Sequence, residues 1–351
     1  MVLRRAKLKD VARQAGVSIS TASKAFNNKP EVATATKARV FEAAATLHFA
    51  PNALIRTLQC GSANTVGICT WPFSLESVNR SLAMHIMRGI YEASNAYRKD
   101  ILLYSKLLGP ATDSFLPTFM DGRVDGLIVS PHVLTGGELT QLAEGGLPTV
   151  VLYNGELPDT MGSVLIDNYS GVRRSILHLH ALGHSRIAFH RPGDTFDLRQ
   201  RTATYRQVML ELGLDCTPQM LIVDESFASD IERHWHQLQS LPFPPTALIV
   251  GHDSTAIEWL EMLTAKGVRV PEDFSIIGFD DVPDASSSLG LTTVRQDAVE
   301  VGRQAMHMLW WIMAGERPSA CRRTLDVELI VRDTTAAPRA SKLEGGSHAR
   351  L

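Results

Sequence analysis

The sequence has few cysteines and no long apolar run. Its four cysteines (Cys60, Cys69, Cys216 and Cys321) are scattered and form no C-x-x-C pair. This argues against a disulfide framework and favours reduced thiols in a reducing compartment. No stretch approaches the roughly 18 apolar residues of a membrane span, and no apolar run follows Arg4 and Arg5 as a secretory signal would require. We therefore expect a cytoplasmic protein with no membrane partner.

The common catalytic motifs are also missing. The sequence contains no G-x-S-x-G, H-E-x-x-H, Walker or G-x-G-x-x-G pattern. His178, His180 and His184 lack the spacing of a metal site, because His-x-His places its two rings on different faces of a helix and no carboxylate or cysteine completes the set. We predict that the protein is not an enzyme, with no catalytic residues, no metal and no cofactor.

What the sequence does have is an uneven charge distribution. Residues 1–60 carry ten Lys and Arg residues against three Asp and Glu residues, a net charge of +7. Residues 61–351 carry 25 basic against 34 acidic residues, a net charge of −9. A basic head on an acidic body indicates that the head meets a polyanion and the body does not.

Three short helical patterns follow one another over residues 8–48. Apolar residues recur with helical spacing in three groups: Leu8, Val11, Ala12 and Ala15; Ala22, Ala25 and Phe26; and Val40, Ala44 and Leu47. Gly16 separates the first two groups, and Ser18 can cap the second helix. Helices this short are not stable alone and must share one small core. The order predicts a helix-turn-helix layout.

From Thr65 onward, apolar strand-like runs alternate with amphipathic helices. The predicted strands are Val66–Cys69, Ile101–Tyr104, Gly126–Val129, Thr149–Leu152, Ser163–Ile166, Arg186–Phe189, Met220–Val223, Ala247–Val250 and Phe274–Gly278. Such alternation is typical of parallel sheets flanked by helices, and the strands are too many for one sheet of usual size. We predict two α/β lobes with parallel sheets, which would bind a small molecule in the crevice at their strand ends.

These patterns divide the chain into four segments. We expect a helix-turn-helix headpiece over residues 1–48, a hinge over 49–64, a two-lobed effector-binding and dimerisation domain over 65–336, and a disordered tail over 337–351. Pro51 and Gly61 bracket one or two turns of helix in the hinge. The tail is polar and contains glycine.

Segments along nearly the whole chain resemble the lactose/galactose repressor (LacI/GalR) family. The motifs that carry the resemblance are 8–27 (LKDVARQAGVSISTASKAFN), 49–52 (FAPN), 56–58 (RTL), 124–128 (VDGLI), 181–189 (ALGHSRIAF), 270–281 (VPEDFSIIGFDD), 291–296 (LTTVRQ) and 331–335 (VRDTT). All of them stand in the order of the family. The resemblance implies a periplasmic-binding-protein-like body behind the DNA-binding headpiece.

The second helix of a helix-turn-helix enters the major groove, and its first residues meet the base edges. By resemblance, Ile19, Ser20 and Lys24 fall where the family reads bases. Ile19 suits a thymine methyl group and Lys24 can donate to guanine. Other implied DNA contacts are Ser18, Thr21, Ser23, Asn27, Asn52 and the hinge residue Leu58, which would wedge into the minor groove. The alternatives are that Ile19 and Lys24 are ordinary surface residues and that Leu58 packs on the body.

The resemblance also places effector-binding residues at the strand ends of the two lobes: Ser130, Tyr153, Arg201, His252, Asp253 and Asp280. Arg201 and Asp280, expected at opposing strand ends, suit a polyhydroxylated ligand because both make charge-assisted hydrogen bonds to hydroxyls. The alternative for this pair is an interlobe salt bridge without ligand contact. For Tyr153 and His252 a structural role weighs about equally. The sequence does not identify the effector.

Together these features predict a repressor that binds a palindromic double-stranded operator as a homodimer and responds to a sugar-like effector. An apolar stripe on the helix after Arg295 (Val299, Gly302, Met306, Leu309, Trp310 and Met313) is predicted to supply the dimer contact. The alternative is a sugar-binding protein without regulatory function, or an enzyme, that carries a headpiece. The basic N-terminal segment favours the repressor.

Overall fold

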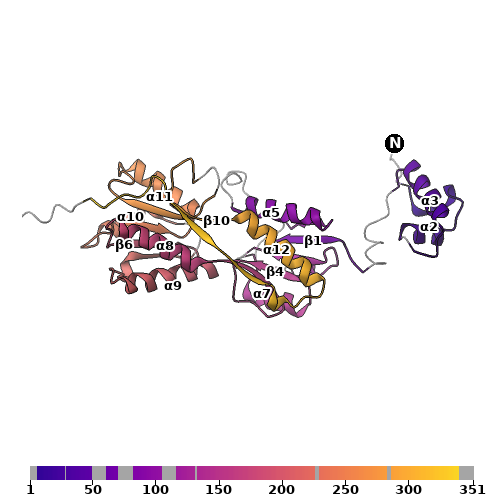
Figure 1. The fold of residues 1–351 in the computed structure, drawn as a ribbon, viewed down its shortest axis with the longest axis horizontal. Helices are drawn as coiled ribbons and strands as arrows, with labels where there is room; N and C mark the ends of the chain where they lie inside the picture. The colour runs from indigo at the N-terminus through magenta and orange to yellow at the C-terminus, as the bar shows by residue number, and fades with distance from the viewer. Residues whose placement is uncertain are drawn as a thin grey trace, which may run out of the picture. The chain divides into compact units, whose positions relative to one another are not determined.

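The structure is a computed structural model that describes residues 6–27, 29–49, 61–69, 82–104, 116–130, 133–225, 229–282 and 286–339. The chain divides into two compact units, Met1–Thr65 with Pro117–Asp125, and Val66–Leu116 with Gly126–Leu351. Both are drawn in Figure 1. Within the described ranges, every helix is too short or too polar to cross a lipid bilayer. The predicted tail lies outside these ranges from residue 340 onward.

Between residues 6 and 49, the described part of the first unit has three helices around a small apolar core. They are α1 (Leu8–Gln14), α2 (Ile19–Phe26) and α3 (Thr34–Thr46). Gly16 takes a φ of +67° between α1 and α2, a conformation that costs glycine little. Val11, Ala22, Ala25 and Val40 are fully buried between the helices. The predicted helix-turn-helix layout is confirmed.

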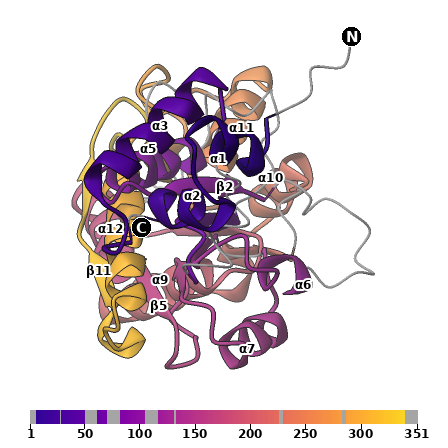
Figure 2. The ribbon, with the colours of Figure 1, turned by 90° about the vertical axis from the view of Figure 1, so that its right-hand side faces the viewer.

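The second unit contains two six-stranded sheets, each the centre of one lobe. The first sheet has the order β11-β5-β4-β3-β1-β2. Its strands are β1 (Thr65–Cys69), β2 (Asp100–Leu103), β3 (Gly126–Val129), β4 (Thr149–Leu152), β5 (Gly162–Ile166) and β11 (Arg322–Leu325). Figures 1 and 2 show α5 (Leu82–Ala96) and α12 (Ala298–Met313) on one face of this sheet and α7 (Gly136–Glu144) on the other. The short helix α6 (Leu116–Phe119) precedes β3 in sequence.

The sheet of the second lobe has the order β12-β10-β9-β8-β6-β7. Its strands are β6 (Ile187–Pro192), β7 (Leu221–Asp224), β8 (Ala247–Val250), β9 (Ser275–Asp280), β10 (Thr293–Gln296) and β12 (Val327–Ile330). Its helices are α8 (Asn168–Ala181), α9 (Phe196–Glu211), α10 (Ile231–Gln239) and α11 (Asp253–Ala265), and η2 (Pro218–Met220) and η3 (Pro318–Ala320) are single 3₁₀ turns of the second unit. All pairs with a described register in both sheets are parallel except β10 with β12.

The chain passes between the lobes three times, after β5, after β10 and after β11. Parallel sheets covered by helices on both faces have strands that are apolar throughout, and β3, β4, β8 and β9 are buried along their whole length. Apolar runs in the sequence predicted the nine strands β1 to β9. They did not predict β10, β11 and β12. In β11 only Leu325 is even partly buried, so no apolar run marks it.

Helix α12 packs inside the first lobe, so the predicted dimer stripe on it is wrong. Met306 and Leu309 are fully buried. Gly302 lies so close to α5 that an added Cβ would stand 2.0 Å from the Ile86 carbonyl oxygen. On the facing helix, a Cβ added to Gly89 would stand 1.8 Å from the Val299 carbonyl oxygen. The apolar stripe therefore marks a tight helix crossing within one chain. Periodicity alone cannot distinguish such a crossing from a contact between subunits.

Candidate functional site

Helix α2 presents the predicted DNA-contacting residues. Ser18 precedes the helix, and its Oγ accepts a hydrogen bond from the Thr21 backbone N–H at 3.0 Å, which satisfies one donor of the first turn. Ile19 is 55% exposed, so its side chain is available for an apolar contact. Ser18, Ser20 and Lys24 are also exposed, whereas Thr21, Ser23 and Asn27 are half-buried.

Lys24 is the long cation on this helix. Its Nζ lies 3.5 Å from the Glu31 carboxylate, and both side chains are about half exposed. An ion pair on the surface is worth about 0–1 kcal/mol, so Lys24 can leave Glu31 for a base or a phosphate at small cost. Asn52 and Leu58, the remaining predicted DNA contacts, lie outside the described residues.

Arg201 lies on α9 in the second lobe and is 2% exposed. Its Nε donates to Asn168 Oδ1 at 2.8 Å, Nη1 donates to the Gly251 carbonyl, and Nη2 pairs with Asp197 at 3.2 Å. The guanidinium carbon lies 3.5 Å from the centre of the Phe279 ring. These contacts fix the guanidinium beside the carboxyl ends of β8 and β9.

Asp280 is the last residue of β9, so it lies in the same lobe as Arg201. The expectation that the two occupy opposing lobes is wrong, and the ion-pair partner of Arg201 is Asp197 on its own helix. Asp280 Oδ1 accepts a hydrogen bond from Gln296 Nε2 at 2.6 Å. Burial raises the pKa of Asp280 well above its usual value, while Arg201 opposes this shift and Asp253 adds to it.

Tyr153 follows β4 in the first lobe and is 3% exposed. Burial raises the pKa of its hydroxyl well above the usual value, and the charges of Asp280 and Asp197 in the other lobe raise it further. The charges of Asp280 and Arg201 therefore act on Tyr153 from the other lobe, and the effector-binding role of the three residues stays a prediction.

Two buried polar atoms of this cluster have no hydrogen-bond partner, namely the Tyr153 hydroxyl and Gln296 Oε1. Its backbone is also strained, because Tyr153 has a φ of +55° and Asp280 a φ of +132°. Unpartnered buried groups and strained residues both cost free energy and gather at binding sites. We call Tyr153, Asp280 and Gln296 the open cluster.

A cavity of about 400 Å³ adjoins the open cluster, a volume suited to a small molecule. Its lining includes Asp280 and Gln296, Leu82 and His85 from α5, and Val299 from α12. Both lobes therefore contribute to it.

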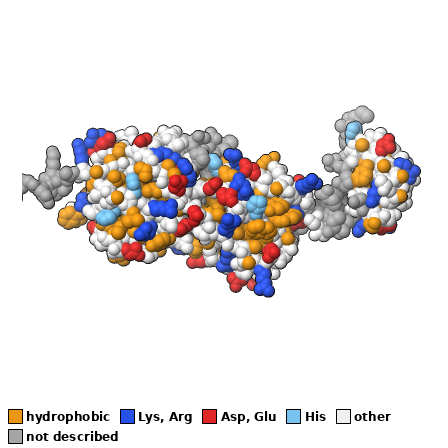
Figure 3. Space-filling view, viewed as in Figure 1, with side chains coloured by type: hydrophobic (Ala, Val, Ile, Leu, Met, Phe, Trp, Pro, Cys, Tyr) orange, Lys and Arg blue, Asp and Glu red, His pale blue; other side chains and the backbone are white. Residues whose placement is uncertain are grey.

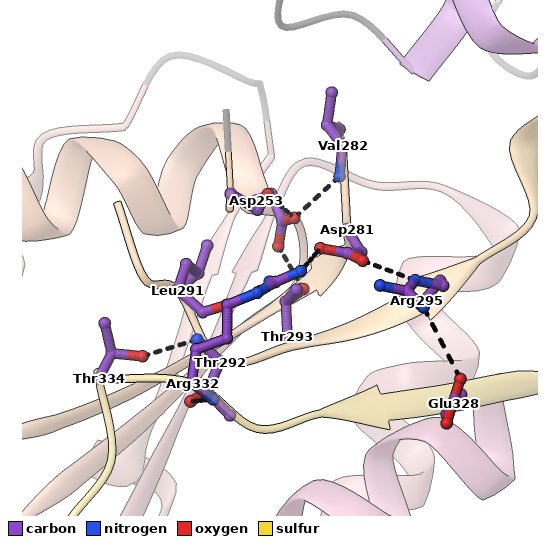
Figure 4. A network of polar contacts seen from close by, with 11 residues as sticks. Asp253, Asp281, Val282, Leu291, Thr292, Thr293, Arg295, Glu328, Arg332 and Thr334 are labelled. Carbon is purple, nitrogen blue, oxygen red and sulfur yellow. Dashed lines mark hydrogen bonds and ion pairs between the residues drawn. The ribbon is translucent and has the colours of Figure 1, made fainter. Parts of the chain in front are cut away.

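Asp281, also in the cavity wall, joins two arginines. Its carboxylate accepts hydrogen bonds from Arg295 Nε and Arg332 Nη2, each at 2.7 Å (Figure 4). These bonds tie the residue after β9 to β10 and to the segment after β12 and so hold this side of the cavity in place.

The structure does not direct Asp253 toward the open cluster. Its side chain is fully buried at the start of α11, where Oδ1 accepts from the Thr293 hydroxyl at 2.6 Å and Oδ2 accepts from Ser286 Oγ and, at 3.3 Å, from the Val282 N–H (Figure 4). Burial raises the pKa of Asp253, and the two hydroxyls oppose the shift. Its contacts tie Val282 and Ser286, which follow β9, to the start of α11.

The other two predicted effector residues lie next to strand ends. Ser130 is buried directly after β3, and its N–H donates to the Cys69 carbonyl at 2.8 Å. His252 precedes α11, is partly exposed, and has Nδ1 3.3 Å from Ser254 Oγ. Their roles toward a ligand stay predictions.

Sequence reasoning missed Gln296, Asn168 and Asp197 as members of this site. Gln296 ends β10, which pairs in parallel with β9, so its side chain meets that of Asp280. Adjacent parallel strands carry their functional residues at the same edge. The segment 291–296, had it been interpreted as a strand, would have pointed to Gln296.

A second buried cluster of the second lobe joins His190 on β6, Asp224 on β7 and His234 on α10, with possible metal-ligand atoms within 4.8 Å of one another. Asp224 accepts hydrogen bonds from both histidine Nε2 atoms at 2.9 Å and from Ser229 Oγ at 2.6 Å. We call His190, Asp224 and His234 the closed cluster.

Trp259 fixes the proton positions of the closed cluster. Its indole N–H donates to His190 Nδ1 at 2.9 Å. Because an indole only donates, Nδ1 carries a lone pair and Nε2 carries the proton. A histidine that binds a metal through Nε2 needs the opposite arrangement, with its N–H at Nδ1 facing an acceptor. The closed cluster is therefore built for hydrogen bonds rather than for a metal ion.

Burial lowers the pKa of His190 to about 4, although the hydrogen bond from its Nε2 to Asp224 acts to raise it. Burial alone would raise the pKa of Asp224, but the hydrogen bonds from Ser229 and His190 hold it below its usual value. At neutral pH the closed cluster is thus a carboxylate beside a neutral His190.

Comparison with known proteins gives matches along the whole chain. Residues 7–52 match the family model of bacterial regulatory proteins, lacI family, and residues 176–335 match that of a periplasmic binding protein-like domain. The HTH-type transcriptional repressor CytR of Escherichia coli is 30% identical over 347 residues, covering 95% of this chain and 97% of the relative. The relatives are transcriptional repressors and regulators, which confirms the prediction of a DNA-binding regulator rather than an enzyme.

Two solved structures have the same architecture. The lac repressor dimer bound to operator and an anti-inducer superposes with a TM-score of 0.77 at 24% identity, covering 95% of this chain and 100% of that one. The transcriptional regulator CelR in complex with cellobiose superposes with a TM-score of 0.68 at 25% identity, covering 94% and 100%. The predicted combination of a helix-turn-helix headpiece and a two-lobed α/β body is confirmed.

Proposed function

The chain belongs to the LacI family of bacterial regulatory proteins, and from this membership we propose that it binds a palindromic operator as a dimer under the control of a sugar or sugar derivative. The open cluster carries the effector part of this proposal. Gln296 Oε1 lacks a donor and the Tyr153 hydroxyl lacks a partner, and Gln296 and Asp280 line a cavity to which the two lobes contribute.

A polyhydroxylated ligand supplies what these atoms lack. Each sugar hydroxyl donates one hydrogen bond and accepts others, so neighbouring hydroxyls can serve the Gln296 and Tyr153 oxygens together with the Asp280 carboxylate. Burial raises the pKa of Asp280 and Arg201 opposes this shift, and the Asp280 carboxyl group bonds sugar hydroxyls in either form, as an acceptor when ionised and also as a donor when protonated. The complex of the related CelR with cellobiose supports the ligand class.

We propose that α2 reads the operator. Ile19 and Lys24 are both exposed on it, one suited to a thymine methyl group and the other to guanine. The charge contrast between residues 1–60 and the rest supports the same assignment. On the face drawn in Figure 3, positive and negative side chains are interspersed over the body, which gives DNA no extended basic surface there.

A dimer would present two such helices to the two halves of a palindrome. Since Met306 and Leu309 of the α12 stripe are buried in the first lobe, we propose that the outer face of α5 contributes to the dimer contact. Met84 is 40% exposed and Tyr91 60% exposed on this face, about two helical turns apart. Sedimentation of Tyr91→Glu tests this surface, and a variant as dimeric as the wild type would exclude it.

The effector is tested by a thermal-shift screen against sugars, polyols, sugar acids and nucleobases. We expect a sugar or sugar derivative to raise the melting temperature of the wild type and of Glu232→Gln, which changes an exposed carboxylate of the same lobe. Asp280→Ala and Gln296→Ala should lose most of this shift. A compound that shifts all four proteins equally binds elsewhere and would overturn the site.

The DNA contact is tested by selecting duplexes from random DNA. Lys24→Ala should lose about 1–3 kcal/mol of binding free energy on the selected duplex and should relax the base preference at one position of each half-site. Lys29→Ala removes an equal charge outside α2 and should weaken all sequences alike. A wild type that selects nothing would favour the alternative of a sugar-binding protein without regulatory function.

A further inference from the structure

Asp125, the residue directly before β3, holds the chain that leads into β1. Its Oδ2 accepts a hydrogen bond from the Ser62 hydroxyl at 2.8 Å, and its Oδ1 accepts one from the Ala63 backbone N–H at 2.6 Å. The Asp125 N–H donates in turn to the Thr65 carbonyl at 2.8 Å. Three hydrogen bonds therefore fasten residues 62–65 to the amino end of β3.

The two strands that start at this junction run side by side toward the effector cavity's end of the sheet. β1 and β3 pair in parallel, with Val66 opposite Gly126 and Cys69 opposite Val129. At their carboxyl ends the Ser130 N–H donates to the Cys69 carbonyl, and Tyr153 follows the neighbouring strand β4. Four residues of strand span only about 13 Å, so the junction and the carboxyl ends are the two ends of one short, buried ribbon.

We propose that Asp125 is a positioning residue that couples the effector site to operator binding, an inference that rests on the proposed function. The DNA-contacting residues all precede Gly61 in the chain. A displacement of β3 reaches them through the Asp125 carboxylate as well as through the backbone of β1. Without that carboxylate, residues 62 and 63 lose the two hydrogen bonds that Asp125 accepts from them, and a displacement of β3 is passed to the headpiece less closely.

The chemistry of the junction gives a matched set of variants. Asp125→Ala removes both side-chain acceptors. Asp125→Asn keeps Oδ1 for the Ala63 N–H and turns its amide N–H₂ toward Ser62 Oγ, which can accept. Asp121→Asn is the control, because Asp121 is an exposed carboxylate of the same loop that pairs with Arg123 at 2.6 Å.

Amide hydrogen exchange of the full chain tests the junction without DNA. In Asp125→Ala the Ala63 amide should exchange about tenfold faster than in the wild type, since it loses a charged acceptor. The Ile68 and Ile128 amides, in the middle of β1 and β3, should keep wild-type rates. Asp125→Asn and Asp121→Asn should resemble the wild type throughout. Equal exchange rates of the Ala63 amide in all four proteins would show that the Asp125 carboxylate does not fasten residues 62 and 63.

Coupling is tested by adding the duplex that the wild type selects from random DNA. By linkage, a site that moves operator binding is moved by the operator in return. The duplex should slow Ser130 exchange about fivefold or more in the wild type, Asp125→Asn and Asp121→Asn. In Asp125→Ala this effect should vanish, and affinity for the duplex should fall about tenfold.

Two outcomes would overturn the coupling. If Asp125→Ala binds the duplex and slows Ser130 exchange as the wild type does, Asp125 has no coupling role, although the proposed function stands. If the wild type selects no duplex at all, the proposed function fails and the coupling fails with it.

Discussion

Two buried carboxylates of the second lobe, Asp224 and Asp280, have opposite surroundings. Asp224 receives hydrogen bonds from two imidazoles and one hydroxyl, so the donors around it are used. Asp280 receives one from Gln296, whose other amide atom has no partner, and the Tyr153 hydroxyl near it has none. Burial of charge alone therefore does not mark a binding site. The unpartnered polar atoms around the charge do.

The backbone repeats this contrast. In the open cluster, Tyr153 and Asp280 both hold a positive φ. In the closed cluster, His190, Asp224 and His234 lie within regular strands and a helix. A protein keeps strained residues where a ligand makes use of them, so we interpret the closed cluster as a structural fastening of β6, β7 and α10.

The largest expected difference between the clusters is in stability. Asp224→Ala leaves two buried imidazole N–H groups without an acceptor and should lower the free energy of unfolding by about 3–5 kcal/mol. Asp280→Ala removes a charge whose burial is already unfavourable and should change it by no more than about 1 kcal/mol. Urea unfolding of both variants measures the difference. Equal losses would show that the open cluster, too, is structural.

The pH dependence should separate the clusters by sign. The pKa of His190 is 6.5 unperturbed and about 4 in the fold, so the unfolded chain binds more protons between these values. Its contribution to stability is present above pH 6.5 and is lost, by about 3 kcal/mol, as the pH falls to 4. The lowered pKa of Asp224 acts in the same direction at lower pH.

Asp280 acts in the opposite direction. Its pKa is raised in the fold, so its contribution is present at low pH and is lost as the pH rises above its unperturbed value. In urea unfolding between pH 7.5 and 4.5, the free energy of unfolding of the wild type should therefore fall as the pH falls. This fall should be steeper in Asp280→Asn and shallower in His190→Gln. An acid loss that is the same in all three proteins would contradict both assignments.

The sequence predicted most of the fold, because helical spacing and buried apolar runs are local signals. It predicted Tyr153, Arg201 and Asp280 as neighbours through resemblance. It did not predict that Arg201 and Asp280 share a lobe, which depends on the three crossings of the chain. It also missed the closed cluster, because His190, Asp224 and His234 are far apart in sequence and form no motif. Whether a buried atom has a partner can be seen only in the structure.

A third prediction concerns whether the closed cluster can take a metal. Trp259→Phe removes the N–H that fixes the His190 proton on Nε2. The ring can then place its proton on Nδ1 and offer Nε2 as a ligand. Excess Zn²⁺ should leave the wild-type melting temperature unchanged and raise that of Trp259→Phe by a few degrees, equivalent to about 1–2 kcal/mol. A larger rise in the wild type would show that the indole does not exclude the metal.

The smallest and sharpest contrast lies between two buried tyrosines that differ in one hydrogen bond. Tyr205 is fully buried, and its hydroxyl donates to the Ile187 carbonyl at 2.7 Å. Tyr153 is 3% exposed, and its hydroxyl has no partner. Tyr205→Phe should lower the free energy of unfolding by about 1–1.5 kcal/mol, whereas Tyr153→Phe should leave it unchanged or raise it slightly, because it removes an unpartnered polar atom. With the effector bound the order should reverse, since Tyr153→Phe loses a bond to the ligand and Tyr205→Phe does not. Urea unfolding with and without the sugar from the thermal-shift screen measures both differences, and equal ligand affinities in the two variants would remove Tyr153 from the effector site.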